Sequence, residues 1–312
     1  MEEKTQTKVK PHILLCYDGS LSSKKAINYI KNVFNDAEIE ITVFQIISPP
    51  ESFFIPSESM LKQLEKEVFV EKELKRLYKD AENKLLKLIE KIKSQLKAKI
   101  NYKILFKTRG IAEDIISFSE KGLFDGIVVG RRGLSKISIY IFGGVTHKLI
   151  NHSPVPVWII RGENWNKKFL IALDLGEIGL KITDYVSFIL KFLPNAQITF
   201  FHSFYPFADL KNFEGDIESI IHKTKNLEYK NFFQKLKDTL ILNQFPLEKI
   251  KLKFKRSIFG PAGEIIRLAK KEDYKTIILG RRGKGGFKEL VLGSVTHKVL
   301  SYFEDRTVWI IN

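Results

Sequence analysis

Cysteine is almost absent from this sequence. Cys16 is the only cysteine in 312 residues, so no disulfide can form within the chain. A chain without disulfides fits a reducing cytoplasm, where we expect this protein to reside. The position of Cys16 in the apolar run ILLCYD predicts an inert buried thiol rather than a redox group.

Long apolar runs are also missing. The longest are the size of a β-strand, far short of the ~20 residues that a membrane helix needs. The first ten residues, MEEKTQTKVK, lack the apolar core of a signal peptide. We therefore expect no membrane partner. At 44% hydrophobic and 28% charged residues, the composition is that of an ordinary globular protein.

Three familiar site motifs are absent as well. There is no G-x4-G-K-[ST] sequence, which excludes a Walker-type ATPase. No G-x-G-x-x-G turn follows the first expected strand, which argues against NAD binding. No histidines and cysteines have the spacing of a zinc site.

Basic residues dominate the charge balance, with a formal net charge of +16. Such a charge can serve nucleic-acid or anionic-membrane binding. It can equally come from lysine-rich helix surfaces, as in the interleaved Lys/Glu run over 65–99. We favour the second interpretation, because the basic residues are spread out and no RNA-recognition aromatic motif is present. A nucleic-acid partner is therefore not expected.

A glycine-rich stretch over 276–300, TIILGRRGKGGFKELVLGSVTHKVL, organises the chain. A short apolar run ends at Gly280, as a buried parallel strand does. Gly283 follows, and after nine intervening residues come Gly293 and Ser294, giving the pattern G-x2-G-x9-G-S. Residues without a Cβ let the backbone approach a phosphate, and a helix start offers unpaired N–H groups to it. Ser294 can cap that helix or donate its hydroxyl to a phosphate oxygen.

The same stretch occurs over 126–150, GIVVGRRGLSKISIYIFGGVTHKLI, at an offset of 150 residues from Gly130 to Gly280. GRRG and VTHK are identical in the two copies. A repeat of this length predicts two similar domains, which we place at 1–163 and 164–312.

The repeated G-x2-G-x9-G pattern, completed by Ser294 in the second copy, together with an Asp ending the first strand of each half, resembles the universal stress protein family. The resemblance covers nearly the whole chain. It implies two tandem Rossmann-like domains of the adenine nucleotide α-hydrolase type, each a five-stranded parallel sheet flanked by helices. It also implies ATP as ligand, and Mg²⁺ as an optional companion of the triphosphate. The final strands, PVWII and TVWII, then pair the two halves or serve as ordinary edge strands.

The resemblance implies a set of nucleotide-binding residues in each domain. In the second domain they are Asp174, Ser203, Leu279, Gly280, Arg282, Gly283, Gly293, Ser294, Val295 and Thr296. The matching set of the first domain is Asp18, Ile46, Val129, Gly130, Arg132, Gly133, Gly143, Gly144, Val145 and Thr146. Asp18 and Asp174 would contact the ribose or base side, and Ile46 an adenine face, where the second half has Ser203.

The first copy departs from the family pattern at Gly144, which stands where Ser294 stands in the second. The backbone N–H remains, but the hydroxyl is lost. One neutral hydrogen bond contributes about 0.5–1.5 kcal/mol, so the first site should be weaker but not abolished.

Strands separated by helical segments predict parallel pairing with right-handed crossovers. Strands are expected at 12–17, 40–47, 102–107, 125–130 and 157–160, and again at 169–173, 197–202, 249–255, 274–280 and 307–311. A long helical pattern over 57–97 reads as a crossover helix, with a break near 68–70 or a coiled-coil arm as the alternatives. A helix is expected over 216–240.

Histidines and arginines near the glycine-rich loops are further candidates for contacts with the phosphates. His147 and His297 lie one turn into the helix, where we expect them to face solvent or pack rather than act as general acids. Of the paired arginines in each loop, at most one should bind phosphate.

The sequence thus favours a nucleotide-dependent stress-response or signalling protein over a rapid enzyme, with no catalytic residue assigned and no dedicated metal site. A scaffold of the same fold acting through protein contacts, a slow ATP hydrolase and a homodimer remain open alternatives.

Overall fold

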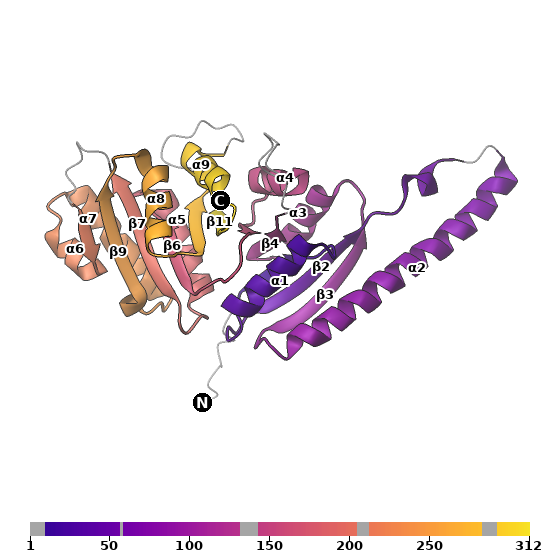
Figure 1. Ribbon diagram of the computed structural model, residues 1–312, viewed down its shortest axis with the longest axis horizontal. Helices are drawn as coiled ribbons and strands as arrows, with labels where there is room; N and C mark the ends of the chain where they lie inside the picture. The colour runs from indigo at the N-terminus through magenta and orange to yellow at the C-terminus, as the bar shows by residue number, and fades with distance from the viewer. Residues whose placement is uncertain (1–9, 57–58, 132–142, 205–211, 283–291) are drawn as a thin grey trace, which may run out of the picture.

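One β-sheet runs through both halves of the molecule. The computed structural model describes residues 10–56, 59–131, 143–204, 212–282 and 292–312. Within them the strand order is β3-β2-β1-β4-β5-β11-β10-β6-β7-β9-β8. The two halves of the chain form the two ends of this sheet (Figure 1).

The first half alternates strands and helices. In chain order its elements are β1 His12–Cys16, α1 Leu21–Val33, β2 Glu40–Ile47, the 3-10 turn η1 Glu51–Phe54, α2 Met60–Lys93, β3 Lys99–Phe106, α3 Ile111–Lys121, β4 Gly126–Gly130, α4 Gly144–His152 and β5 Val157–Ile160. The strands β3, β2, β1, β4 and β5 pair in parallel. This half is the expected five-stranded parallel sheet.

The second half repeats the plan with one addition. Its elements are β6 Lys168–Ala172, α5 Glu177–Leu190, β7 Gln197–Phe204, β8 Phe213–Gly215, α6 Ile217–Lys223, α7 Leu227–Leu242, η2 Leu247–Lys249, β9 Ile250–Arg256, α8 Gly260–Lys271, β10 Thr276–Gly280, α9 Ser294–Tyr302 and β11 Thr307–Ile311. Five of its strands are parallel, and the short β8 adds an antiparallel edge beside β9. This edge strand was not predicted.

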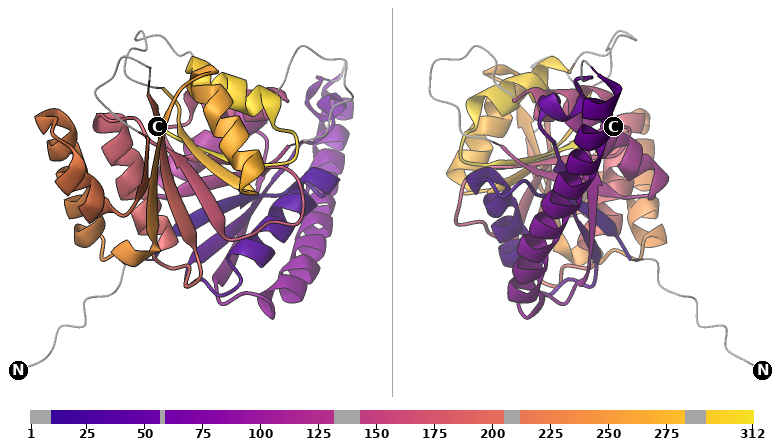
Figure 2. Two further views of the ribbon diagram at one scale, coloured as in Figure 1. Left: turned by 60° about the vertical axis from the view of Figure 1, so that its left-hand side comes forward. Right: turned by 90° about the vertical axis from the view of Figure 1, so that its right-hand side faces the viewer.

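Helices cover both faces of the sheet (Figure 2). Buried side chains of α1, α2, α5, α6 and α7 pack on one face, and those of α3, α4, α8 and α9 on the other. The strands are apolar on both sides because both faces are covered, as in parallel sheets generally. Layers of this kind are the expected α/β architecture.

The two halves join edge to edge through their final strands. β5 and β11 pair antiparallel, with Trp158 opposite Trp309. The two indole rings stack at a centroid distance of 3.8 Å and are both fully buried. The Trp158 indole N–H donates to the Tyr185 hydroxyl of the other half at 2.9 Å, and Tyr29 contacts Thr276 across the same junction at 3.1 Å. The expected pairing of PVWII and TVWII is therefore confirmed.

Two arginines reinforce this junction at helix ends. Arg281 donates to the carbonyls of Asn151 and Ser153, which end α4 of the first half. Arg161 donates from Nη1 to the carbonyl of Leu300 at 2.7 Å and also to that of Phe303, at the end of α9. A cation at a helix C-terminus is favourable because the carbonyls there carry partial negative charge. Arg161 is thus part of the buried interface.

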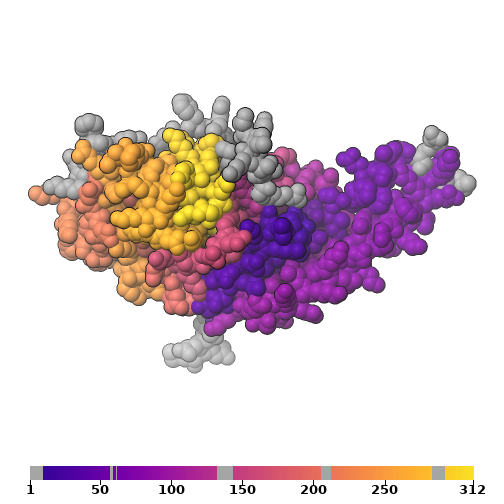
Figure 3. All heavy atoms as spheres, viewed as in Figure 1, coloured from indigo at the N-terminus to yellow at the C-terminus, as the bar shows by residue number. Residues whose placement is uncertain are grey.

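The long helix α2 is continuous over the described residues. Ser59 caps it by accepting a hydrogen bond from the Lys62 N–H. Toward its C-terminal end, Leu85 and Ile92 are buried in the core, as a crossover helix requires. Its N-terminal part extends beyond the sheet (Figures 1 and 3), where Met60 is 83% exposed. The suggested break near 68–70 is absent.

One further expectation needs correction. The helix predicted over 216–240 is two helices, because Asn226 caps α7 by accepting from the Tyr229 N–H and so separates α7 from α6. Within the described residues no helix is both long and apolar enough to cross a bilayer.

Candidate functional site

A cavity of about 250 Å³ lies in the first half, where β1 and β4 end. It is bounded by the residues following β1, by β2, by the start of α3 and by the start of α4. Its lining residues are Cys16, Tyr17, Asp18, Ser20, Ser23, Phe44, Ile46, Ile111, Ile115, Val129, Gly130, Gly143, Gly144, Val145 and Thr146. The carboxyl ends of parallel strands are the usual ligand-binding edge of such a sheet.

The starts of three helices surround this cavity. Ser20 caps α1, while Gly110 and Gly143 precede α3 and α4 without a side-chain cap. The first N–H groups of a helix have no partner within it and carry partial positive charge. The first hydrogen bond of the α4 backbone is donated by the His147 N–H to the Gly143 carbonyl. The N–H groups of the preceding residues are therefore available to an anion.

Glycine is required at the end of β4 and leaves room at the start of α4. A Cβ on Gly130 would lie 1.9 Å from the Ser22 carbonyl oxygen, so the end of β4 can approach α1 this closely only without a side chain. Among the described residues, a Cβ on Gly143 or Gly144 would meet nothing within 4 Å. The start of α4 is thus open on the side where a side chain would stand.

The inner wall of the cavity is apolar. Phe44 is 1% exposed and stacks on Phe118 at 4.5 Å between ring centroids. Ile46, Ile115 and Val129 complete the wall. An apolar wall opposite a set of N–H groups suits a ligand that is flat at one end and anionic at the other.

The polar rim carries one carboxylate. Asp18 is exposed and accepts a hydrogen bond from the Ser20 N–H at 3.0 Å. Gly19, between them, has φ of +79°, a conformation that favours glycine. Burial raises the pKa of Cys16 to about 12, and the Asp18 charge adds to the effect. Cys16 is only partly buried and lines the cavity, unlike the buried thiol predicted from the sequence, and its inertness stays a prediction.

The second half has the same frame around Gly280 and Gly293. The Gly293 N–H donates to the Arg281 carbonyl at 2.9 Å, and the Thr296 hydroxyl donates to the Gly280 carbonyl at 2.7 Å. These bonds tie the start of α9 to the end of β10. Ser294 is the first residue of α9 and is exposed, so Gly293, not Ser294, is the N-cap. The Ser294 hydroxyl is accordingly not used as a cap.

Asp174 follows β6, and Ser203 lies at the end of the neighbouring strand β7. Both are partly exposed. The Ser203 Oγ is buried and has no hydrogen-bond partner among the described residues. A buried hydroxyl without a partner is rare, because such groups are usually satisfied by protein or by an ordered water.

The structure brings most of the predicted residues together at the expected edge. Eight of the first-half set line the cavity, while Arg132 and Gly133 lie outside the described residues. In the second half Leu279, Gly280, Arg282, Gly293, Val295 and Thr296 lie at or next to the β10–α9 corner. Gly283 lies outside the described residues. Their role in binding nucleotide stays a prediction.

Several lining residues were missed by sequence reasoning. Tyr17, Ser20, Ser23, Phe44, Ile111 and Ile115 also face the first-half cavity. The serines could have been found, since they follow Asp18 and Gly19 at the end of a strand and mark a helix start. The apolar residues had no signal that separated them from the core.

The arginines and histidines near the glycine corners differ in their surroundings. Arg281 is engaged at the junction with the first half, which leaves Arg282 as the described phosphate-binding candidate in that loop. His147 and His297 are exposed, as expected. No three His, Cys, Asp or Glu side chains gather as a metal site within the described ranges.

This architecture is that of a tandem α/β protein whose two halves repeat the same strand, glycine corner and helix. The sequence profile of the universal stress protein family matches residues 11–161 and again 166–304. The chain therefore belongs to the universal stress protein family, as two tandem domains.

Relatives agree with this assignment. A universal stress protein of Methanocaldococcus jannaschii is 23% identical over 150 residues, covering 48% of this chain and 81% of that protein. A universal stress protein of Bacillus subtilis is 51% identical over 39 residues, which cover 12% of this chain and only 26% of that protein.

Solved structures show the same fold. A universal stress protein from Archaeoglobus fulgidus superposes with a TM-score of 0.63 at 19% identity, covering 96% of this chain and 98% of that one. A protein from Pseudomonas aeruginosa described as a universal stress protein gives a TM-score of 0.58 at 14% identity, covering 97% and 94%.

Proposed function

We propose that this universal stress protein binds ATP at the carboxyl edge of its sheet and acts as a nucleotide-dependent stress-response or signalling protein. The observation that carries the proposal is the first-half cavity, where three helix starts face an apolar wall. Adenine would lie against Phe44 and Ile46, and the phosphates would lie at Gly143 and Gly144.

Charge and shape support this ligand. Helix N-termini stabilise anions, each by about 0.3–1 kcal/mol at exposed positions. A ring packed on the apolar wall contributes through the area that it removes from water. Asp18 is an acceptor at the rim and suits the ribose hydroxyls.

We propose that the second domain binds ATP more tightly than the first. Ser294 places an exposed hydroxyl at the start of α9, where the first domain has Gly144. Arg282 adds a cation whose Nε has no partner among the described residues. Mg²⁺ would arrive with the triphosphate, and its ligands would be phosphate oxygens and water.

Binding rather than turnover is the proposed activity. Each described site offers one carboxylate and backbone donors, with an exposed histidine one turn further along the helix. Rapid hydrolysis needs a base positioned on the attacking water. Nucleotide occupancy would then alter contacts with a partner protein. Homodimer formation stays a separate expectation, tested by sedimentation.

The experiment is mass spectrometry of the small molecules that leave the gently purified protein on denaturation. The proposal expects release of an adenine nucleotide, at up to about two equivalents per chain. A protein that releases no nucleotide, and whose melting temperature does not rise with saturating ATP, would contradict it. Such a result would favour the scaffold alternative.

A further inference from the structure

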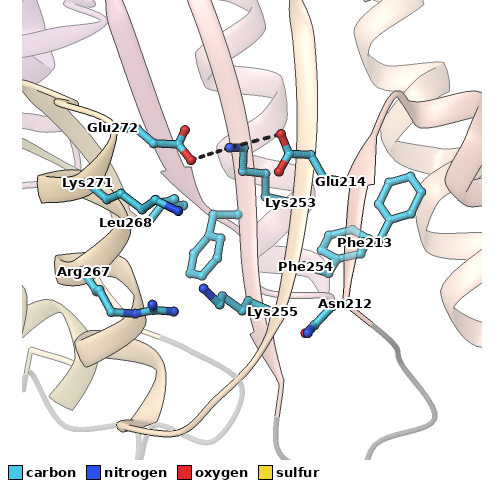
Figure 4. A pocket seen from close by; sticks show the side chains of 11 residues that line it. Asn212, Phe213, Glu214, Lys253, Phe254, Lys255, Arg267, Leu268, Lys271 and Glu272 are labelled. Atoms are coloured by element: carbon cyan, nitrogen blue, oxygen red, sulfur yellow. Dashed lines mark hydrogen bonds and ion pairs between the residues drawn. The ribbon is translucent and has the colours of Figure 1, made fainter.

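A second cavity of about 350 Å³ lies at the outer edge of the second half (Figure 4). Its floor is formed by β7, β8 and β9, and one wall by α8. Its lining residues are Phe201, Asn212, Phe213, Glu214, Lys253, Phe254, Lys255, Arg267, Leu268, Lys271 and Glu272. None of the predicted nucleotide-binding residues belongs to it. We name it the α8–β9 groove.

The two acids of the α8–β9 groove are already neutralised. Lys253 is 9% exposed and lies between them, with its ammonium 2.5 Å from Glu272 and 3.4 Å from Glu214 (Figure 4). Glu214 also pairs with Lys251. Glu272 further accepts a hydrogen bond from the Tyr274 hydroxyl at 3.0 Å. These contacts fix the floor and leave its acids engaged.

The other end of the groove is cationic. Lys255, Arg267 and Lys271 lie there with Asn212, and the Lys255 ammonium points across toward Arg267 (Figure 4). Arg267 uses Nε and Nη2 to bind Glu264, which does not line the groove. Like charges that face one another repel, and an anion between them removes that cost. The arrangement therefore favours a bound anion.

Among the described residues, the first half has different side chains at the positions that correspond to this groove. At the offset of 150 residues, Ser117 corresponds to Arg267 and Phe118 to Leu268. Phe118 stacks on Phe44 and fills the corresponding space. In the strand register Phe44 pairs with Lys103 as Phe201 pairs with Lys253, so Leu105 corresponds to Lys255. The second half thus differs by the smaller side chain of Leu268 and by the two added cations, Arg267 and Lys255.

We propose that the α8–β9 groove is a binding site for a small polyanion carrying phosphate groups, separate from the nucleotide site. Lys255, Lys271 and the free Nη1 side of Arg267 would bind the phosphate oxygens. Asn212 would donate its amide N–H groups. The ring of Phe201, which packs in the same cluster as α8, would contact an apolar part of the ligand. The size of the groove suits a free metabolite rather than a macromolecule.

The test is calorimetric titration of the full chain with inorganic pyrophosphate. A background of Gly143→Val with Gly293→Val keeps pyrophosphate out of both glycine-rich corners, so the outcome does not depend on the proposed function. In this background we expect saturable binding. Lys255→Leu with Lys271→Gln should weaken it about tenfold or more, because charge-assisted hydrogen bonds are lost. Leu268→Phe, which copies the first half, should abolish it by filling the groove.

The matched control is Lys121→Gln, since Lys121 is the first-half counterpart of Lys271. It removes the same charge and should change the dissociation constant less than about twofold. Equal weakening by Lys121→Gln would overturn the proposal by showing a response to net charge alone. Unchanged binding in the Lys255 and Leu268 variants would overturn it too. A single-stranded oligonucleotide that displaced pyrophosphate at lower concentration would overturn the small-ligand assignment.

Discussion

The two halves of this chain share a frame but differ where ligands would bind. Both end β4 or β10 at a glycine, begin the next helix after a glycine, and contribute a tryptophan to the junction. They differ at Gly144 and Ser294, and at Phe118 and Leu268. The glycine corners and the tryptophans of the junction are therefore kept in both copies, while a few cavity-facing positions, such as Ile46 and Ser203, diverge.

The crossover after the second strand differs as well. The first half uses the single helix α2 of 34 residues, whereas the second uses β8, α6 and α7. The short β8 pairs with β9 and helps to form the α8–β9 groove. The lengths of these connections, rather than the glycine motif, give each half its own surface.

The largest expected effect comes from removing the junction that both halves share. Trp158→Ala should destabilise the protein by about 3–5 kcal/mol, because it leaves a cavity in a fully buried stack. Trp309→Ala should cost a similar amount. The double variant should cost less than the sum, since each ring packs on the other. Guanidinium unfolding followed by circular dichroism measures all three, and a cost under ~1 kcal/mol for each single change contradicts the junction's role.

A glycine pair in the first half gives the next largest difference. Gly130→Ala should destabilise by about 2–4 kcal/mol, since its Cβ would lie 1.9 Å from the Ser22 carbonyl oxygen. Gly144→Ala is the control and should stay within about 0.5 kcal/mol, because nothing lies within 4 Å of its Cβ. Equal losses of unfolding free energy in the two variants would show that the close approach of β4 to α1 is not real.

Asp114 makes the loop before α3 sensitive to acid. Burial raises the pKa of Asp114, but hydrogen bonds donated by Thr108 and Arg109 outweigh it, so the net pKa is lowered. A lowered folded-state pKa stabilises above the unfolded value of about 3.9, and this contribution is lost as pH falls through the folded pKa. Asp114→Asn should therefore cost about 1–3 kcal/mol at neutral pH and progressively less below pH ~4. Urea unfolding at a series of pH values tests this; a pH-independent difference rejects it.

The smallest expected effect sharpens the comparison at the helix starts. Gly144→Ser gives the first half the residue of the second, and the space around its Cβ is open. One added hydrogen bond of about 0.5–1.5 kcal/mol should tighten ATP binding at the first site about 2- to 10-fold. Isothermal titration in a Gly293→Val background isolates that site. Weaker binding would show that the hydroxyl obstructs rather than assists the phosphates.

Much of the fold could be predicted because local and global patterns agree. The alternating strands and helices follow from apolar periodicity and turn residues, and the two domains follow from the repeat at 150 residues. The pairing of the final strands was implied by the family resemblance. The edge strand Phe213–Gly215 could not be predicted, because three residues carry no periodicity. The separation of α6 from α7 depends on the cap at Asn226, a single polar residue inside an otherwise helical pattern.

The site was predictable in its backbone and less so in its side chains. Gly130 is constrained by the close approach of the Ser22 carbonyl, and Gly143 precedes α4; the spacing of the repeated motif points to both positions. Phe44 and Ile115 line the cavity only because of how α3 packs on the sheet. The role of Arg281 at the end of α4 depends on hydrogen bonds to Asn151 and Ser153. These residues are 130 and 128 positions away in the sequence, so no local pattern reveals the contacts.

The most direct test of the account is calorimetric titration of ATP into the wild type, Gly293→Val and Gly143→Val. Each valine places its side chain at the helix start where the phosphates are proposed to bind. We predict two sites in the wild type, with the tighter one lost in Gly293→Val and the weaker one lost in Gly143→Val. Three identical titrations, or no heat of binding in any of them, would contradict the claim that these helix starts hold the nucleotide.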